Sequence, residues 1–570
     1  MSTFDWIIVV LTLGFVVLYG VHKSRTSKNL DGYFLGNRSM PWWVVLLSIM
    51  GTQASAITFL SGPGQAYADG MRFVQYYLGL PLAMIVICIS FVPLFNKLKV
   101  YTAYQFLEER FDARTRTFTA CLFLLQRGLS TGISIYAPSI ILSSLFGWDI
   151  FWTNIVMGGL LIIYTTAGGA KAVAYTQQLQ LVIIFAAMAL AGYFAVKLLP
   201  NGIGFMDALH IGGRMGKLNI ITTGVQENGF DWNDRYNIWS GVIGGFFLAL
   251  SYFGTDQSQV GRYLTAQNNR ESRLGLLMNG FVKIPMQFLI LLVGVLIFSF
   301  YQFTAAPLSF NEALVDKTAK VDSGHVARLQ ATLRQLQQQR RQVVQQLVQP
   351  TPTTTATGTA DALRQINNRI AGVRNQFRAL AAANGLGDGN DTNYVFLSFV
   401  KQYLPAGLKG LLIAVIFLAA WGSIAAALNS LSASTVVDFH RRHRPFKDEH
   451  AEYKISQAYT IGWGLFSILV AQFAHGLGQS LIEAVNVLGS LFYGVILGIF
   501  LLAFYFKNVT GRPVFIAAVI VQLFVLILFF NEHIPIFSFL PDIGFLWMNV
   551  VGAVGVVLLG CSLRYVYRLR

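Results

Sequence analysis

Charged residues are scarce in this chain. Only 12% of its 570 residues are Asp, Glu, Lys or Arg, whereas 54% are hydrophobic, and the mean hydropathy is +0.54. Soluble domains carry about 25% charged residues, so this composition excludes a soluble globular protein. We therefore expect an integral membrane protein. Its formal net charge of +16 mostly reflects basic residues that set the orientation in the membrane, and it does not indicate nucleic-acid binding.

Cysteines and catalytic motifs are also few. The three cysteines, Cys88, Cys121 and Cys561, lie within or at the edge of apolar spans and lack paired or metal-ligand spacing, which indicates inert packing residues. The sequence has no metal-ligand cluster, nucleophile motif or Walker-type glycine loop. It therefore argues against an enzyme and against transport powered by nucleotide hydrolysis.

Long apolar runs are abundant instead. About thirteen of them approach the roughly 20 residues that a helix needs to cross a bilayer. The first has an acidic flank at Asp5 and no convincing cleavage site, so we expect a retained helix and not a signal peptide. The runs lie near residues 4–22, 42–70, 74–96, 117–145, 149–169, 174–199, 238–261, 276–303, 406–437, 455–475, 481–506, 513–531 and 543–565.

Lysine and arginine divide the connections between these runs into two sets. Basic residues follow the first, third, seventh and ninth runs, and Arg564, Arg568 and Arg570 follow the last, whereas the short loops between the other runs carry almost none. The positive-inside rule therefore predicts a multi-pass protein of the cell membrane with an extracytoplasmic N-terminus and a cytoplasmic C-terminus. An odd number of crossings agrees with this orientation.

One run contains residues that a lipid-facing helix does not favour. Within 42–70 the chain has Gly51-Thr52-Gln53-Ala54-Ser55-Ala56 and then Ser61-Gly62-Pro63-Gly64. Freed backbone groups are tolerated in a membrane only where protein or a water-filled cavity satisfies them, and in secondary transporters unwound carbonyls bind the coupling cation. The segment therefore indicates ion-coupled transport, and a helix with a glycine-rich packing face is the alternative interpretation.

Residues 305–405 interrupt the apolar pattern with a polar segment. Apolar side chains recur mostly at steps of three and four in residues 326–347 and again in 366–380, which predicts two amphipathic helices. The Pro- and Thr-rich linker at 350–359 predicts an antiparallel hairpin, which the charge count makes extracytoplasmic. We interpret it as a tolerated surface insertion, since long insertions cost little stability, and a lid or a docking site for a partner is the alternative.

Several motifs of the chain are informative together. They are YTAYQFLEERF at 101–111, IYAPSIIL at 135–142, the Ala167-Gly168-Gly169 turn, and Asp256-Gln257 followed by GRYL at 261–264. These motifs resemble the sodium/solute symporter family, most closely the branch that contains the iodide, monocarboxylate and multivitamin carriers. The resemblance covers the whole chain except the polar hairpin.

The resemblance implies an all-α polytopic fold with a LeuT-like five-plus-five inverted repeat. The first repeat is expected at residues 42–199 and the second at 237–507, interrupted at 305–405 by the hairpin insertion. An extra helix and loop at 1–41, an extracytoplasmic loop at 200–236 and two C-terminal helices at 508–570 complete the expected organisation.

The resemblance also implies a sodium site between the break in the first core helix and the eighth core helix. Sodium is a hard cation, and carbonyl and hydroxyl oxygens supply its ligands without a net negative charge. Gly422 stands where the family often has a hydroxyl residue, so a carbonyl or a water is expected there. The implied ligands are carbonyl oxygens of Gly51, Ala54 and Ala419, the position of Gly422, and the hydroxyl of Ser423.

A second sodium site, which some members build on a Trp-Thr-Asp motif, has little support here. The matching residues are Tyr175-Thr176-Gln177, without a carboxylate, and Ala426 lacks the hydroxyl that the eighth core helix would add. Gln177 still has an oxygen to offer. We therefore favour one coupled sodium ion over two.

Three positions that contact sugar hydroxyls in the sugar-carrying members correspond here to Thr58, Tyr77 and Ala249. A sugar site must pair many hydroxyls, and this set offers few hydrogen bonds, so a sugar is disfavoured. Tyr252 resembles the tyrosine that closes the inner side of the pocket, with aromatic packing as its alternative role. Lys283 resembles a lysine of the sugar carriers and is a candidate for a second polar contact.

Arg127 lies several residues inside the third core helix, where a charge is costly unless it faces a cavity or a partner. An anionic substrate would be such a partner, and snorkelling toward lipid headgroups or pairing with a loop carboxylate is the alternative. We therefore predict a sodium-coupled symporter that imports a small organic or inorganic anion by alternating access. A symporter of sugars or other neutral solutes is one alternative, and a channel or transporter-like sensor is another.

Overall fold

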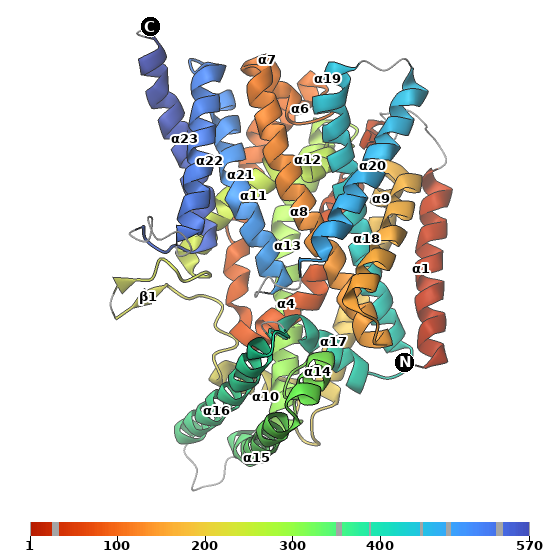
Figure 1. The fold of residues 1–570 in the computed structure, drawn as a ribbon, viewed down its shortest axis with the longest axis vertical. Helices are drawn as coiled ribbons and strands as arrows, with labels where there is room; N and C mark the ends of the chain where they lie inside the picture. The colour runs from red at the N-terminus through yellow and green to blue at the C-terminus, as the bar shows by residue number, and fades with distance from the viewer. Residues whose placement is uncertain are drawn as a thin grey trace.

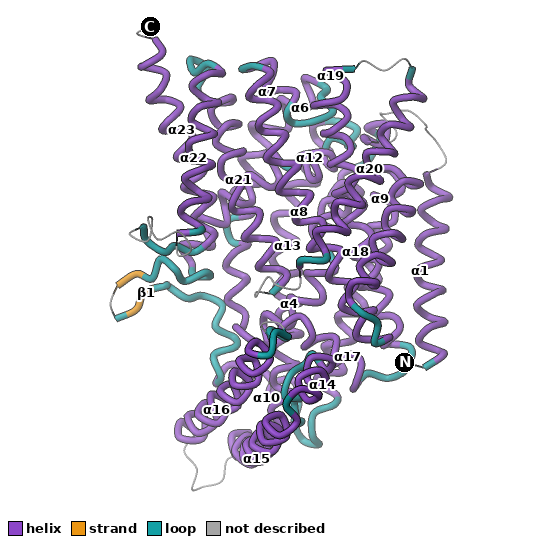
Figure 2. Tube along the Cα trace, in the orientation of Figure 1, coloured by secondary structure: helices purple, strands orange, loops and turns teal. Residues whose placement is uncertain are grey.

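The computed structural model of the protein is a bundle of helices with its N-terminus at one end and its C-terminus at the other (Figure 1). It describes residues 2–24, 34–227, 229–348, 356–386, 389–444, 448–474, 480–531 and 540–568. Within these ranges the strand structure consists of β1 (Val225–Gln226) and β2 (Gly229–Phe230), which pair antiparallel at the side of the bundle (Figure 2). The expected all-α membrane architecture is confirmed.

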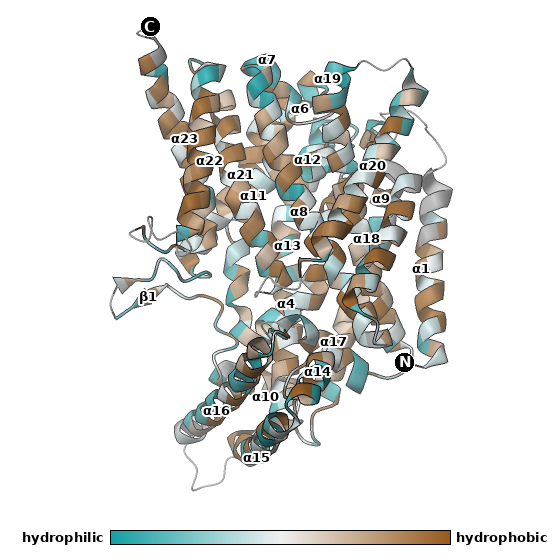
Figure 3. Ribbon diagram, in the orientation of Figure 1, coloured by the Kyte–Doolittle hydropathy of each residue, from teal (hydrophilic) through white to brown (hydrophobic). Residues whose placement is uncertain are grey.

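Eight described helices are long and apolar enough to cross a membrane, and four shorter apolar helices accompany them. Hydrophobic residues dominate the bundle, whereas hydrophilic residues are more frequent toward its ends (Figure 3). The expected crossings correspond to α1 (Thr3–Ser24), α3 (Trp42–Gln53) with α4 (Ala56–Asp69), α5 (Leu80–Val86) with α6 (Val92–Leu98), α8 (Ala113–Phe146), α9 (Ile150–Lys197), α11 (Gly245–Thr255), α13 (Asn269–Phe303), α18 (Leu408–Ser434), α20 (Glu449–Ala471), α21 (Leu481–Tyr505), α22 (Gly511–Phe529) and α23 (Phe545–Arg568).

Shorter elements connect these helices. They are η1 (Gly36–Arg38), η2 (Gly70–Tyr77), η3 (Ile87–Phe91), α7 (Gln105–Arg110), α10 (Phe205–Arg214), η4 (Ser240–Gly244), α12 (Gln257–Tyr263), α14 (Glu312–Val321), α15 (Ser323–Val348), α16 (Ala356–Ala383), η5 (Thr392–Tyr394), α17 (Val395–Tyr403), η6 (Thr435–His440) and α19 (Arg441–His443).

Helix α9 contains two of the expected crossings. The hydroxyls of Tyr164 and Thr176 lie 3.0 Å apart, although twelve residues of straight helix would separate them by about 18 Å along the axis. The chain therefore reverses between these two residues, where the Ala167-Gly168-Gly169 turn is expected. We call Ile150–Thr166 the first arm of α9 and Val173–Lys197 its second arm.

Two membrane helices are interrupted. Between α3 and α4, Ala54 and Ser55 leave helical geometry, and Ser55 is extended at φ −81° and ψ 172°. Between α11 and α12, Asp256 is extended at φ −75° and ψ 119°. The two breaks fall in the first helix of each expected repeat, which is where secondary transporters bind ions and substrates. The residue boundaries of the repeats and flanking segments stay a prediction.

The polar insertion forms the expected antiparallel pair, α15 and α16, at the same end of the bundle as the N-terminus (Figure 1). One part of its apolar seam closes on itself, with Leu333 and Phe377 in a cluster of their own. Another part does not, because Leu347 and Leu363 share a core with Phe300 of α13. Most of the expected linker, residues 349–355, lies outside the described residues.

Polar anchors also tie the hairpin to the membrane helices. Arg340 of α15 donates to the Tyr301 carbonyl at the end of α13, and Gln337 donates to the Ala306 carbonyl at 2.6 Å. After α16 the chain is anchored again, because Asn393 Oδ1 of η5 accepts a hydrogen bond from Ser61 Oγ of α4 at 2.7 Å. These contacts attach the hairpin to the membrane helices, and contacts this far apart in sequence leave no periodic signal in either segment. The tolerated insertion stays a prediction.

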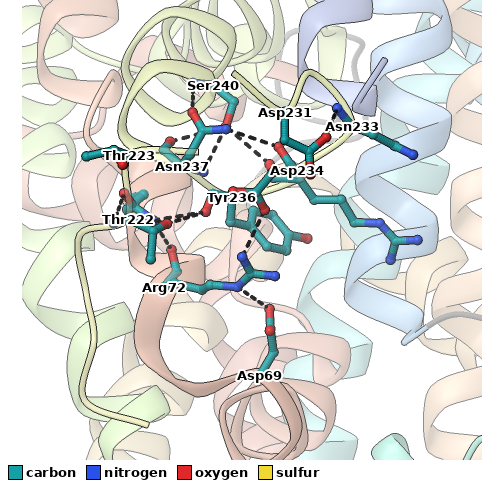
Figure 4. Close-up of polar contacts among 12 residues, drawn as sticks. Asp69, Arg72, Thr222, Thr223, Asp231, Asn233, Asp234, Tyr236, Asn237 and Ser240 are labelled. Carbon is teal, nitrogen blue, oxygen red and sulfur yellow. Dashed lines mark hydrogen bonds and ion pairs between the residues drawn. The ribbon is translucent and has the colours of Figure 1, made fainter. Parts of the chain in front are cut away.

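The loop at 200–236 is held against the end of α4 by a network of polar contacts (Figure 4). Arg72 of η2 bridges Asp69 at 2.9 Å and Asp234 at 2.8 Å. Thr222 Oγ1 donates to the Tyr236 carbonyl at 2.9 Å, which closes the second part of the loop, residues 222–236. The network thus ties the loop to η2 and to the C-terminal end of α4.

Candidate functional site

The break between α3 and α4 frees backbone oxygens. In a continuous helix the Ser55 amide would donate to the Gly51 carbonyl, but here it donates to the Gln53 carbonyl at 3.0 Å. The Thr58 amide would likewise donate to the Ala54 carbonyl, but it donates to the Ser55 carbonyl at 3.0 Å. The carbonyl oxygens of Gly51 and Ala54 thus lose their helical donors, which is what a backbone cation site requires.

Helix α18 places a hydroxyl opposite this break. Ser423 Oγ donates to the Ala419 carbonyl at 3.0 Å and to the Ala420 carbonyl at 3.2 Å. Ser423 lines the same cavity as Thr52 and Ser55, and α18 packs on both α3 and α4. The break and the Ser423 hydroxyl therefore border one space, as a site shared by the first and eighth core helices requires.

Gly422 differs from the other expected ligands. Its carbonyl already accepts a hydrogen bond from Gln177 Nε2 at 3.0 Å. The same Gln177 amide donates to Thr52 Oγ1 at 3.2 Å and accepts from Ser48 Oγ at 2.9 Å. Gln177 thus joins the second arm of α9 to α3 and α18. Its oxygen is engaged in this bridge, which agrees with the preference for one coupled sodium ion.

A cavity of about 810 Å³, counted with its open part, lies beside this break. It is lined by α4, η2, α8, α11, α18 and α21, so both expected repeats contribute to it. It brings together the predicted substrate residues Thr58, Tyr77, Arg127 and Tyr252.

Two predicted substrate residues do not line this cavity. Ala249 packs against the hydrophobic core, while its neighbour Leu248 lines the cavity, since one step along a helix changes the face. Lys283 is fully buried on α13, with its Nζ 5.6 Å from the centre of the Tyr77 ring. Tyr77 thus stands between Lys283 and the cavity, and Nζ has no hydrogen-bond partner among the described residues.

Arg127 reaches the cavity from α8, with 7% of its surface exposed. Its Nη1 lies 3.9 Å from Asp256 Oδ2, and its guanidinium carbon lies 5.9 Å from the centre of the Tyr252 ring. A separation of 3.9 Å exceeds a hydrogen bond. Asp256 therefore compensates part of the charge of Arg127, and the Nε–H group remains without a partner among the described residues.

Asp256 is itself fixed by neighbouring elements. It accepts from the Ser258 amide at 2.7 Å and from the Tyr493 hydroxyl of α21 at 2.5 Å. Gln259 Nε2 donates to the Tyr252 hydroxyl at 2.7 Å and orients that ring beside Arg127. The break between α11 and α12 is therefore linked to α8 and α21 through one carboxylate.

Four further polar residues of α8 line the cavity and are absent from the predicted set: Gln126, Ser130, Thr131 and Ser134. They follow one another at steps of four, one and three, so they lie on one side of the helix, which is a signal that the sequence does carry. The hydroxyls of Ser130 and Thr131 donate to the Arg127 carbonyl, at 3.4 Å and 2.6 Å. Their oxygens thus remain acceptors, and the cavity is more polar than expected.

Comparison with known proteins places this architecture among sodium-coupled carriers. The model of the Sodium:solute symporter family matches residues 33–334 and 369–520. The human sodium/iodide cotransporter is 31% identical over 258 residues, which span 44% of this chain and 38% of that protein's length. The sodium/sialic acid symporter SiaT of Proteus mirabilis is 24% identical over 563 residues, 96% of this chain and 92% of that protein.

A solved structure of a Na⁺-coupled sialic acid symporter, in a substrate-bound outward-open state, shares the fold. The two superpose with a TM-score of 0.75 and 22% sequence identity over 99% of this chain and 98% of the other. The expected family, the LeuT-like fold, sodium as the coupling ion and a transporter instead of an enzyme are confirmed. This multi-pass membrane chain belongs to the sodium:solute symporter family.

Proposed function

We propose that the cargo of this sodium-coupled symporter is a small organic anion that carries a carboxylate. The observation that supports this most is the buried guanidinium of Arg127, whose donors Asp256 leaves open. A guanidinium binds a carboxylate through two parallel hydrogen bonds. A charge at this depth needs a partner or a cavity, and Arg127 has a partial partner and a cavity.

The cavity lining favours an organic anion over a halide. Ser130 and Thr131 present oxygen acceptors, and Asn486 of α21 contributes an amide whose Nδ2 is unpaired among the described residues. A halide has no hydrogen to donate, so it would leave the acceptors unused, whereas a hydroxylated carboxylate uses both kinds of group. The relatives named for iodide and for sialic acid both carry anions.

The sodium ion would be held by the carbonyl oxygens of Gly51, Ala54 and Ala419 and by the hydroxyl of Ser423. Of these residues Ser423 lines the cavity, together with Thr52 and Ser55 of the break, while Arg127 borders it from α8. An ion that joins the break to α18 stabilises the arrangement that the anion binds, so each ligand raises the affinity for the other. Cotransport of one cation with one anion also avoids moving a net charge through the bilayer.

We further propose that the hairpin and the N-terminus face the extracytoplasmic side. Figure 1 shows both at one end of the bundle, with α7, α19 and the C-terminus at the other end. The basic residues Arg110, Arg441 and Arg442 lie in α7 and α19. The positive-inside rule assigns that end to the cytoplasm.

Uptake by the purified protein in liposomes tests the substrate proposal. Sialic acid, lactate, iodide and glucose would compete with a labelled carboxylate under an inward sodium gradient. We expect the two carboxylates to compete and glucose not to. Arg127→Lys keeps the positive charge but loses the planar guanidinium that forms two parallel hydrogen bonds. We expect this variant to weaken anion uptake about tenfold or more while the half-saturating sodium concentration stays unchanged.

A matched control is Arg114→Lys, an exposed arginine in the first turn of α8 that does not line the cavity. It should transport like the parent. If Arg127→Lys and Arg127→Gln both transport like the parent, or if only glucose competes, the anion assignment is refuted and Arg127 is a structural residue.

A further inference from the structure

A second cavity lies between the hairpin and the outer ends of the membrane helices. It has about 1170 Å³ of space, counted with its open mouth. Tyr67 and Ala68 of α4, Phe298 and Gln302 of α13, and Thr392 of η5 line one side, and α15 and α16 line the other. Tyr67 lies nine residues beyond Thr58 on α4, so this cavity is separate from the one that holds Arg127.

The charges around this cavity are nearly all positive. Its lining contains one carboxylate, Asp391, against five basic side chains: Lys217, Arg340, Arg364, Arg374 and Arg378. Two of these cations have carboxylate partners, because Arg378 pairs with Asp391 at 3.1 Å and Arg364 pairs with Asp361 at 2.9 Å. Among the described residues the other three form no salt bridge.

The three uncompensated cations are held by neutral groups. Arg340 donates to the Tyr301 carbonyl, Arg374 Nη2 donates to the Pro307 carbonyl at 2.9 Å, and Lys217 Nζ donates to the Ala68 carbonyl. The Nε atoms of Arg340 and Arg374 are buried without a hydrogen-bond partner in the described ranges. Burial lowers the pKa of Arg340 to about 10, so the guanidinium is still charged at neutral pH.

Three cations that form no salt bridge within the described ranges line one cavity and repel each other, and their donors are held in place by the carbonyl contacts. An anion with several oxygen acceptors removes both costs, because it neutralises the charge and pairs the unpaired Nε–H groups. The aromatic rings at the wall support planar guanidinium groups, with the Arg374 carbon 4.9 Å from the centre of the Phe310 ring. These features are typical of a carboxylate or oxyanion site and not of a cation site.

We propose that this cavity is a second anion-binding site, which takes a carboxylate or a tetrahedral oxyanion at the extracytoplasmic face. The hairpin supplies Arg340 and Arg374, and the loop after α10 supplies Lys217. A role in collecting the cargo before it enters the inner cavity rests on the proposed function, whereas anion binding itself does not.

The hairpin thereby acquires a role that its polar sequence alone does not show. Asn393 Oδ1 accepts from Ser61 of α4 and from the Leu481 amide of α21, at 2.7 Å and 3.2 Å. Both helices also line the inner cavity. Thr392, the neighbour of Asn393, lines the second cavity, so η5 lies between that cavity and two helices that border the inner one.

Binding of inorganic sulfate to the purified full-length protein, measured by calorimetry without sodium, tests the proposal. An Arg127→Gln background removes the inner guanidinium, so sulfate binding that persists there is assigned to another site. On that background we expect Arg374→Gln and Lys217→Gln each to weaken sulfate binding about tenfold or more, the loss of one charge-assisted contact. The matched control Arg369→Gln, an exposed arginine of α16 outside the cavity, should change nothing.

In a second experiment a labelled carboxylate replaces sulfate. Comparison of the two affinities shows whether the second cavity binds a carboxylate such as the cargo or an inorganic anion. The proposal is overturned if sulfate and the carboxylate both fail to bind the Arg127→Gln protein, or if Arg374→Gln, Lys217→Gln and Arg369→Gln bind alike. If Arg374→Gln does not yield folded protein, Lys217→Gln against Arg369→Gln decides. Loss of transport in Arg127→Gln with retained sulfate binding supports this site irrespective of the cargo.

Discussion

Replacement of Ser423 by alanine probes the sodium site most directly. The structure leaves the carbonyls of Gly51 and Ala54 without helical donors and places the Ser423 hydroxyl across from them. A hydroxyl that contacts a charged group contributes about 1.5–3 kcal/mol. Taking the lower half of that range, because water can replace part of the contact, half-saturating sodium should rise roughly tenfold to fortyfold.

The assay is uptake of the labelled anion by the reconstituted protein as a function of sodium concentration. Ser430→Ala is a matched control, since Ser430 lies two turns further along α18 and donates to the Ala426 and Ala427 carbonyls in the same manner. Ser430 does not line the cavity. The control should leave the sodium dependence unchanged, so a shift seen only in Ser423→Ala reports on a ligand and not on helix packing.

At saturating sodium, Ser423→Ala should bind the anion with the affinity of the parent, because the variant disturbs the linkage and not the anion contacts. An unchanged half-saturating sodium concentration would refute the assignment of Ser423. An equal shift in Ser430→Ala would show that the effect comes from α18 as a whole.

Three further outcomes are expected. Deletion of residues 327–380 should lower the melting temperature and the uptake, because Leu347 and Leu363 share a core with α13; full uptake at an unchanged melting temperature would speak against that shared core. Gly64→Ala should lower the melting temperature, since a Cβ there would lie 1.9 Å from the Thr392 carbonyl oxygen, whereas Gly372→Ala, with nothing within 4 Å, should not. Tyr493→Phe removes the hydroxyl that donates to Asp256 at 2.5 Å, so the Asp256 carboxylate should compete more strongly with the anion for Arg127. We expect the KM for the anion to rise several-fold while the half-saturating sodium concentration stays constant. An unchanged KM would show that Asp256 does not influence anion binding.

Features that depend on local chemistry were predictable from the sequence. The break at Ala54 follows from small and polar residues within an apolar run, and the reversal of α9 follows from the Ala167-Gly168-Gly169 turn. The paired amphipathic helices follow from apolar side chains at steps of three and four. Each of these signals lies within a short window of the chain, where periodicity and backbone preference act.

Features that depend on contacts between distant segments were not predictable in this way. Arg127 and Asp256 lie on different helices, and no spacing in the sequence predicts that they approach each other. Whether Ala249 or Leu248 faces the cavity depends on a rotation of about 100° on α11, which a helix uniformly apolar in composition does not reveal. The sequence predicts that Lys283 contacts the substrate, but its Nζ lies behind the Tyr77 ring and does not line the cavity.

The hairpin illustrates the same limit. Its internal seam is visible in the periodicity of residues 326–347, but its attachment through Gln337 and Arg340 uses polar side chains that donate to carbonyls near the end of α13. Such donors look like ordinary solvent-exposed residues in a polar helix. Long-range hydrogen bonds therefore decide whether an insertion is separate from the transporter or part of it.

Sodium-driven accumulation of a carboxylate by the purified protein tests the central claim most directly. Under an inward sodium gradient, labelled carboxylate should rise inside the liposomes above its external concentration, and the accumulation should disappear when choline replaces sodium. A carboxylate that only equilibrates, at the same rate in sodium and in choline, would contradict the account and indicate a channel.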